Sequence, residues 1–279
     1  MIWVAVGFAL LALGLCLYWA FIITEGAYLG GRTVAWTYDL TATRYDGIKH
    51  FNPFDDARFL AVPMIESLRQ VDCPLVLDVA TGTGRMIQAL LDRPSFGGTV
   101  IGLDLSYRML QQAESKLSAY ASRHALIWCD AQYLPFPDDM FDAVSCLEAL
   151  EFMPSSRRVL LNMARVLRPG GVFLATNRVN WERRVMPGKA FTDSQLRAIF
   201  SEVGLVGLSV RPWQVYYDLI WARKPGEQSR LGRGTYELAQ VLRCPRCAYS
   251  PLVGFPDHLF CPSCGRECAI NGHICSISS

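Results

Sequence analysis

A short motif of one acid and two glycines is the part of this sequence best suited to chemistry. Asp78 ends an apolar run, and Ala80, Gly82 and Gly84 follow it at alternate positions. This pattern is typical of a buried parallel strand that turns sharply into a helix, because glycine lets the backbone approach a nucleotide-like ligand closely. The dinucleotide-binding fingerprint has a third glycine three residues further on, where this chain has Ile87. The motif therefore keeps the strand-to-helix turn of that fingerprint but departs from its spacing.

Two later apolar runs also end in acids. Asp104 lies 20 residues after Gly84, at a position from which a carboxylate can accept hydrogen bonds from both hydroxyls of a ribose. Asp130 ends the next run and is followed by Ala131 and by the sequence Leu-Pro-Phe at residues 134–136. The carboxyl ends of parallel strands meet at one edge of a sheet, so we expect these acids to line a common crevice.

Taken together, the D-x-A-x-G-x-G motif, these acids and the apolar runs at 141–144 and 167–173 resemble the class I S-adenosylmethionine-dependent methyltransferases. The resemblance is to the ubiquinone and menaquinone C-methyltransferases of the methyltransferase type 11 family. It implies a Rossmann-like α/β fold with a seven-stranded sheet in the order 3-2-1-4-5-7-6, and S-adenosylmethionine as cofactor. The alternative is a generic doubly wound domain that binds some other nucleotide.

The resemblance also implies a role for each motif residue. Asp78 is expected to bind the loop or the amino group of the cofactor, Asp104 the ribose, and Asp130 with Ala131 the adenine edge. Tyrosines of the preceding segment, Tyr38 or Tyr45, are expected near the methionine end. The predicted cofactor-binding residues are Tyr45, Asp78, Ala80, Thr81, Gly82, Gly84, Asp104, Leu105, Met109, Asp130, Ala131 and Leu147.

The methyl acceptor is expected beyond the strand ends at 146–152 and 177–181. Similar quinone C-methyltransferases carry a histidine or an acid near the position of Glu151, which is therefore the predicted catalytic residue. A buried carboxylate there can have a raised pKa and act as a base. The alternative is a glutamate that is solvated or paired with a cation.

Apolar periodicity predicts the elements that position these residues. Thr192 and Gln195 form a capping box, and Ser155 or Ser156 can cap the helix before it. The last two strands predict an antiparallel hairpin. The predicted strands are 75–79, 99–104, 125–129, 141–146, 171–177, 206–214 and 217–223, and the predicted helices are 84–92, 106–121, 156–167 and 192–203.

Residues 2–23 contain no charged side chain, and this is enough chain to cross a bilayer as a helix. A cleaved signal peptide is the alternative, but a basic start and a small-residue cleavage site are missing. Arg32, Arg44 and Lys49 follow the segment, so the positive-inside rule predicts a single-pass membrane protein whose catalytic domain is cytoplasmic. The net charge of +2 argues against nucleic acid as a partner.

Six of the 10 cysteines lie in residues 244–279. Cys244 and Cys247 form one Cys-x-x-Cys pair, and Cys261 and Cys264 form a second pair after thirteen intervening residues. Four thiolates in two such pairs predict a structural zinc site, with iron or disulfides as alternatives. The segment resembles a zinc ribbon of the Trm112-like type, which leaves a protein partner possible.

The sequence thus divides into an anchor, a lid, a catalytic domain, a linker and a ribbon. Our leading hypothesis is methyl transfer to a small hydrophobic acceptor, such as a quinone or a lipid, at the membrane. An RNA or protein methyltransferase that grips its substrate through the ribbon is the second hypothesis, and a non-enzymatic scaffold is the third. The predicted boundaries are 1–23, 24–68, 69–225, 226–240 and 241–279.

Overall fold

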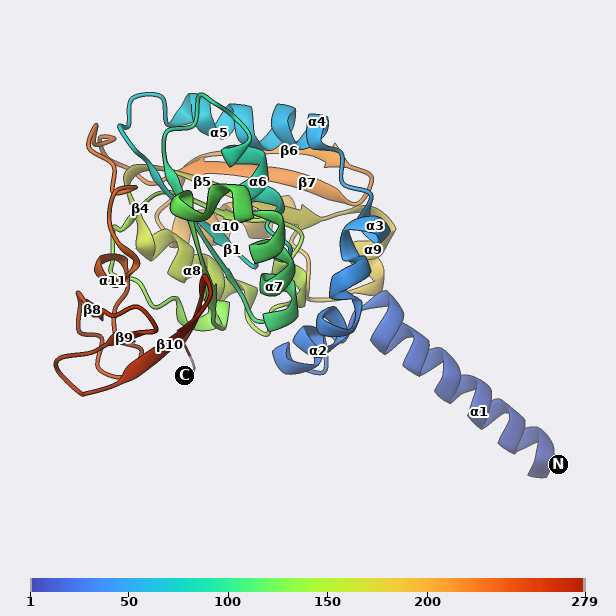
Figure 1. Ribbon diagram of the computed structural model, residues 1–279. Coiled ribbons are helices and arrows are strands. Elements are labelled where there is room, and N and C mark those ends of the chain that lie inside the picture. Colours follow the sequence, from blue (N-terminus) through green and yellow to red (C-terminus); the bar gives the residue numbers. More distant parts are fainter. Residues whose placement is uncertain (1, 278–279) are drawn as a thin grey trace.

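The computed structural model describes residues 2–277 and shows an α/β fold built on one central sheet (Figure 1). Across the sheet the strands follow the order β6-β7-β5-β4-β1-β2-β3-β11-β10-β9-β8. The first seven confirm the predicted order 3-2-1-4-5-7-6, and the other four extend the sheet beyond it. The bounds of the first seven are β1 Leu75–Val79, β2 Thr99–Asp104, β3 His124–Trp128, β4 Phe141–Cys146, β5 Leu167–Arg178, β6 Val206–Gln214 and β7 Tyr217–Arg223.

Strand β1 is buried along its whole length because both faces of the sheet are covered. It runs parallel to β2 and β4, and this register places Asp78 between Gly102 and Ser145. Strand β7 is antiparallel to both β5 and β6, which confirms the predicted hairpin. The parallel strands end at one edge, where the chain turns into the loops that carry the acids.

The helices of the catalytic domain begin at the caps that the sequence predicts. Thr192 and Gln195 form the capping box, and the Ser155 hydroxyl accepts a hydrogen bond from the amide of Arg158. The helix predicted for 106–121 ends earlier, at Lys116, and continues as 3₁₀ turns over residues Ser118–Arg123. The helices are α6 Arg85–Leu91, α7 Tyr107–Lys116, α8 Ser156–Val166, α9 Asn180–Val185 and α10 Asp193–Glu202, with 3₁₀ turns at Ala131–Tyr133 and Leu150–Phe152.

The N-terminal segment begins with an apolar helix that projects away from the body of the molecule (Figure 1). This helix, α1 with its wider last turn η1, spans Ile2–Ile23 and is long and apolar enough to cross a membrane. The following segment folds over the catalytic domain. Its elements are α2 Gly31–Thr41, a 3₁₀ turn at Ala42–Arg44, α3 Tyr45–Lys49, α4 Pro53–Asp56, a π turn at Ala57–Ala61 and α5 Val62–Ser67.

The C-terminal segment packs on the catalytic domain and continues its sheet. Strand β11 runs parallel to β3, with Ile274 opposite Leu126. The apolar side chains of the segment share one buried cluster with those beneath the sheet. Residues 226–240, predicted as a linker, lie against the domain, where the Thr99 hydroxyl donates to the carbonyl of Gly234 at 2.6 Å. The elements are α11 Leu238–Val241, β8 Val253–Gly254, β9 His258–Phe260, β10 Glu267–Asn271 and β11 Ile274–Ser276.

Candidate active site

The loop after β1 is organised around the buried carboxylate of Asp78. Its two oxygens accept hydrogen bonds from the hydroxyls of Thr81 at 2.6 Å and Ser145 at 2.7 Å. Burial nevertheless raises the pKa of Asp78 to about 6. Ala80 and Gly82 both have a positive φ, of 56° and 54°, so the loop is held in a conformation that side chains rarely adopt. This tight turn is the one that the motif predicts.

Asp104, at the end of β2, joins this loop to the next one. Its carboxylate accepts hydrogen bonds from the amides of Gly82 and Ser106, each at 2.8 Å. Burial raises its pKa to about 6, even though both amides favour the charged form. A carboxylate fixed by two amides has free lone pairs with which to accept hydrogen bonds from ribose hydroxyls.

These strand ends line a cavity of about 110 Å³, which we call the strand-end cavity. Asp78 and Thr81 line a smaller hollow beside it, together with Gly82. The Tyr38 and Tyr45 rings, 5.7 Å apart, cover the cavity from the N-terminal segment. The predicted cofactor-binding residues that line the strand-end cavity are Tyr45, Ala80, Gly82, Asp104, Leu105, Asp130, Ala131 and Leu147.

Two of the predicted cofactor-binding residues lie away from the lining. Met109, on the first turn of α7, is buried in the apolar core with 1% of its surface exposed. Gly84 precedes α6 with a φ of 81°, and a Cβ atom there would lie 2.9 Å from Leu117 Cδ1. Its glycine therefore serves close packing between the loop and α7, and does not itself face the cavity.

A second, larger cavity of about 560 Å³ lies next to the base of the apolar helix, and we call it the anchor-side cavity. Ile22 and Ile23, the last residues of that helix, form part of its wall. Trp181 of α9 and Tyr217 of β7 contribute on another side. Apolar and aromatic side chains thus share the wall with charged ones, such as Arg85 and Arg178, around a space that is large enough for a ring-containing acceptor.

Glu148 lies at the boundary of the two cavities, since it lines both of them. Its φ of 51° is unusual for a residue other than glycine, and backbone strain of this kind clusters at functional sites. The side chain is 8% exposed, and its carboxylate pairs with Arg85 at 2.7 Å and with Lys49 at 3.5 Å. The sequence pattern did not single out Glu148 as a functional residue, although its place two residues after the end of β4 was the available signal.

Glu151, the predicted catalytic residue, is 1% exposed and lines neither cavity. Its Oε1 accepts hydrogen bonds from Arg178 at 3.0 Å and from the Tyr217 hydroxyl at 2.6 Å. Burial raises the pKa of Glu151, while the charge of Arg178 opposes that rise. Because Arg178 and Tyr217 both line the anchor-side cavity, Glu151 is placed to hold them there. The structure therefore shows the alternative that the sequence left open, in which Glu151 is paired with a cation.

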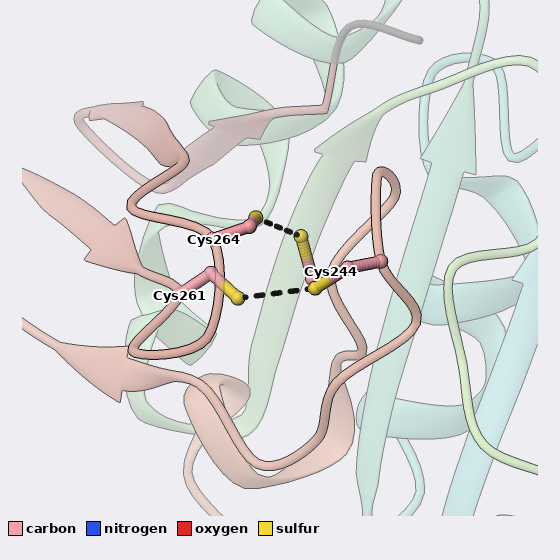
Figure 2. Close-up of side chains that lie close together, drawn as sticks. Cys244, Cys261 and Cys264 are labelled. Atoms are coloured by element: carbon pink, nitrogen blue, oxygen red, sulfur yellow. Dashed lines mark hydrogen bonds between the residues drawn. The ribbon is translucent and has the colours of Figure 1, made fainter.

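The four cysteines of the two Cys-x-x-Cys pairs come together in the C-terminal segment. Figure 2 labels three of them, Cys244, Cys261 and Cys264. All four sulfur atoms lie within 4.8 Å of one another. The distances from Cys244 to Cys264 and from Cys247 to Cys261 are both 3.5 Å. A tetrahedral zinc with bonds of about 2.3 Å needs sulfur separations of about 3.8 Å, so the cluster can hold that ion with little movement.

Comparison with known proteins shows which family combines this fold with this site. Residues 77–175 match the methyltransferase domain family. The demethylmenaquinone methyltransferase of Bacillus licheniformis is 36% identical over 169 residues, which are 49% of this chain and 72% of that enzyme. The ubiquinone/menaquinone biosynthesis C-methyltransferase UbiE of Bordetella avium is 40% identical over 99 residues, 36% of this chain and 39% of that protein. The chain belongs to this family of S-adenosylmethionine-dependent methyltransferases.

Solved structures agree on the fold. The [4+2]-cyclase SpnF superposes with a TM-score of 0.57 at 18% identity, covering 71% of this chain and 98% of that one. A Haloferax volcanii structure of the Trm112 methyltransferase activator with a methyltransferase gives 0.53 at 21% identity, covering 69% and 97%. At these identities the likeness concerns the fold alone.

Proposed function

We propose that this methyltransferase is held at a membrane by the apolar helix and methylates a quinone-like acceptor in the anchor-side cavity. The observation that carries the proposal is the position of that cavity. The anchor-side cavity adjoins the strand-end cavity at Glu148. Elsewhere its wall includes Ile22 and Ile23, at the end of the apolar helix. Two relatives named for quinone methylation support the class of acceptor.

The strand-end cavity is the proposed site of S-adenosylmethionine. Asp104 would accept hydrogen bonds from the ribose hydroxyls, and Asp130 with Ala131 would face the adenine. When bound, the cofactor would supply a methyl group carried on a positively charged sulfur, and this sulfur would become a neutral thioether as the methyl group is transferred to the acceptor. The glycine loop lets the chain approach the cofactor closely, and the rings of Tyr38 and Tyr45 exclude water from above.

The acceptor carbon must lose a proton when it gains the methyl group. Glu148 is the carboxylate placed at the junction of the two cavities, and it is the proposed proton acceptor. Arg85 and Lys49 fix its direction through the ion pairs described above. Arg178 would donate a hydrogen bond to an oxygen on the acceptor ring, and Glu151 and Tyr217, which both accept hydrogen bonds from Arg178, would position its guanidinium.

A transfer experiment tests the class of acceptor. The full chain in vesicles is incubated with tritium-labelled S-adenosylmethionine in four separate reactions. Each reaction contains one acceptor, which is lipid extract, RNA, protein or a demethylated naphthoquinol. We expect label in the lipid fraction and in the naphthoquinol, and none of it with the Asp104→Asn variant. Label in RNA or protein instead would refute the proposal and favour the ribbon-held macromolecular substrate.

We further propose that the four cysteines bind one structural zinc ion. All four positions of a tetrahedral site would be filled by protein, which leaves none for a reacting water. The sulfur separations described above support this donor set. Metal analysis should give one zinc per chain, and Cys244→Ser should lose it. Iron at the same stoichiometry, or a folded metal-free segment, would contradict the assignment.

A further inference from the structure

The surface around the base of the apolar helix carries exposed apolar side chains from three separate elements. Trp36 and Leu40 stand on α2, Trp181 on α9 and Val215 on the turn between β6 and β7, and each is at least half exposed. We call these four residues the collar. Single exposed apolar residues are ordinary, but a group placed around one membrane-length helix is not.

The collar elements are tied to the last turns of that helix. The Trp19 indole donates to the carbonyl of Val185 at 3.0 Å, which fixes α9 against the helix end. The Thr37 hydroxyl lies 3.3 Å from the carbonyl of Glu25 and so links α2 to the same region. Figure 1 shows α2 and α9 at the base of α1. The collar therefore has a fixed position relative to the helix.

The same surface carries cations. Arg32 of α2 and the neighbouring Arg183 and Arg184 of α9 are exposed, and none of them forms an ion pair within residues 2–277. Aromatic side chains mixed with free arginines are the composition that favours the headgroup region of a bilayer containing anionic lipid. The arginines and the exposed apolar side chains thus both favour a bilayer containing anionic lipid as the partner of this surface.

We propose that the collar lies in the bilayer interface and that the anchor-side cavity opens toward the lipid. Trp181 and Val215 belong to both the collar and the cavity lining, so the mouth of the cavity is part of the surface that would meet the membrane. A lipid-soluble acceptor could then enter from the bilayer without crossing water. This inference rests on the proposed function for the acceptor, but the contact with lipid stands independently of it.

Tryptophan quenching tests the contact directly. The full chain is placed in vesicles of phosphatidylcholine and phosphatidylglycerol, with or without lipids brominated near the headgroup, and its fluorescence is compared among variants. The W36F/W181F variant should lose less fluorescence to bromine than the wild type, because two quenched side chains are gone. Trp128→Phe is the matched control, since Trp128 is 39% exposed on β3, beside β11. Equal quenching of wild type and W36F/W181F would overturn the proposal.

A second measurement separates this proposal from the acceptor assignment. W36E/L40E changes collar residues that line neither cavity, and Leu231→Glu is its exposed control elsewhere on the molecule. We expect W36E/L40E to methylate a short-chain, water-soluble acceptor normally and to slow at least fivefold on a long-chain acceptor held in vesicles. An equal rate on both acceptors would count against the collar. A wild type that methylates neither acceptor would refute the proposed function, whereas the quenching result would still decide the collar.

Discussion

Replacing Asp104 by asparagine is the sharpest test of the cofactor site, because the structure predicts opposite effects on stability and on binding. In the folded protein burial raises the pKa of Asp104 from 3.8 to about 6. At roughly 1.4 kcal/mol per pKa unit, the ionised carboxylate costs the cofactor-free fold about 3 kcal/mol. A raised pKa stabilises the fold only at low pH, and this contribution is lost as the pH rises from 3.8 to about 6. Asparagine avoids this cost but has one acceptor oxygen for the two amides, and the lost hydrogen bond offsets about 1–2 kcal/mol of the gain. At pH 8 the variant should therefore unfold at no lower temperature than the wild type.

Binding should respond in the other direction. Hydrogen bonds to a charged acceptor contribute about 1.5 kcal/mol or more, so two ribose hydroxyls give about 3 kcal/mol, or roughly 100-fold in affinity. Isothermal titration calorimetry with S-adenosylhomocysteine at pH 8 measures this loss. Asp92→Asn is the control, since Asp92 caps the far end of α6 and accepts a hydrogen bond from the Tyr120 hydroxyl at 2.7 Å.

The pH dependence gives a second readout of the same residue. With a pKa of about 6, roughly one tenth of Asp104 is ionised at pH 5, so wild-type affinity should fall about tenfold from its value at pH 8. Asp78 has a similar raised pKa, about 6, so the difference between wild type and D104N isolates Asp104. Affinity within threefold of wild type at pH 8, or an identical pH dependence, would refute the ribose assignment.

Three further predictions concern stability. Chelation, or Cys247→Ser, should lower the melting temperature of the whole catalytic domain by several degrees, because the cysteine segment shares its sheet and core; two independent transitions by calorimetry would contradict this. Glu151→Gln should cost about 2 kcal/mol in denaturant unfolding, because the buried Arg178 keeps only Glu182 as an acidic partner, whereas Glu202→Gln, in an exposed pair, should cost under about 1 kcal/mol. Gly84→Ala should destabilise by about 1–2 kcal/mol through its contact with Leu117 and its positive φ, and an unchanged midpoint would disprove that reasoning.

Local pattern was enough to predict the catalytic sheet. Each strand of the parallel core is a short apolar run bounded by turn residues, and the caps of α8 and α10 are set by residues within one turn of the helix. The glycine loop was predictable for the same reason, since Gly82 and Ala80 adopt their positive φ within a few residues of Asp78. Such features depend on neighbours in the sequence, which a single chain displays.

Contacts between distant segments were not predictable in this way. Glu148 gained its importance from pairing with Arg85 across 63 positions of sequence, and from facing two cavities that exist only after packing. The sequence drew attention to Glu151, which is instead buried behind Arg178 and Tyr217. Nothing local distinguishes the two glutamates, because they lie on the same short segment.

By itself the sequence determined the class of fold, the acids at the strand ends, the pairing of the four cysteines into two Cys-x-x-Cys motifs and the apolar helix. Each of these features depends on composition or on residues that are close together in the sequence. The chemistry of strands, turns and thiolates therefore predicts them without knowledge of the tertiary structure. Only the tertiary structure decided that β11 extends the sheet at β3, that Glu148 separates two cavities, and that α2 and α9 surround the base of α1. These depend on long-range pairing and side-chain packing, for which one sequence contains no local signal.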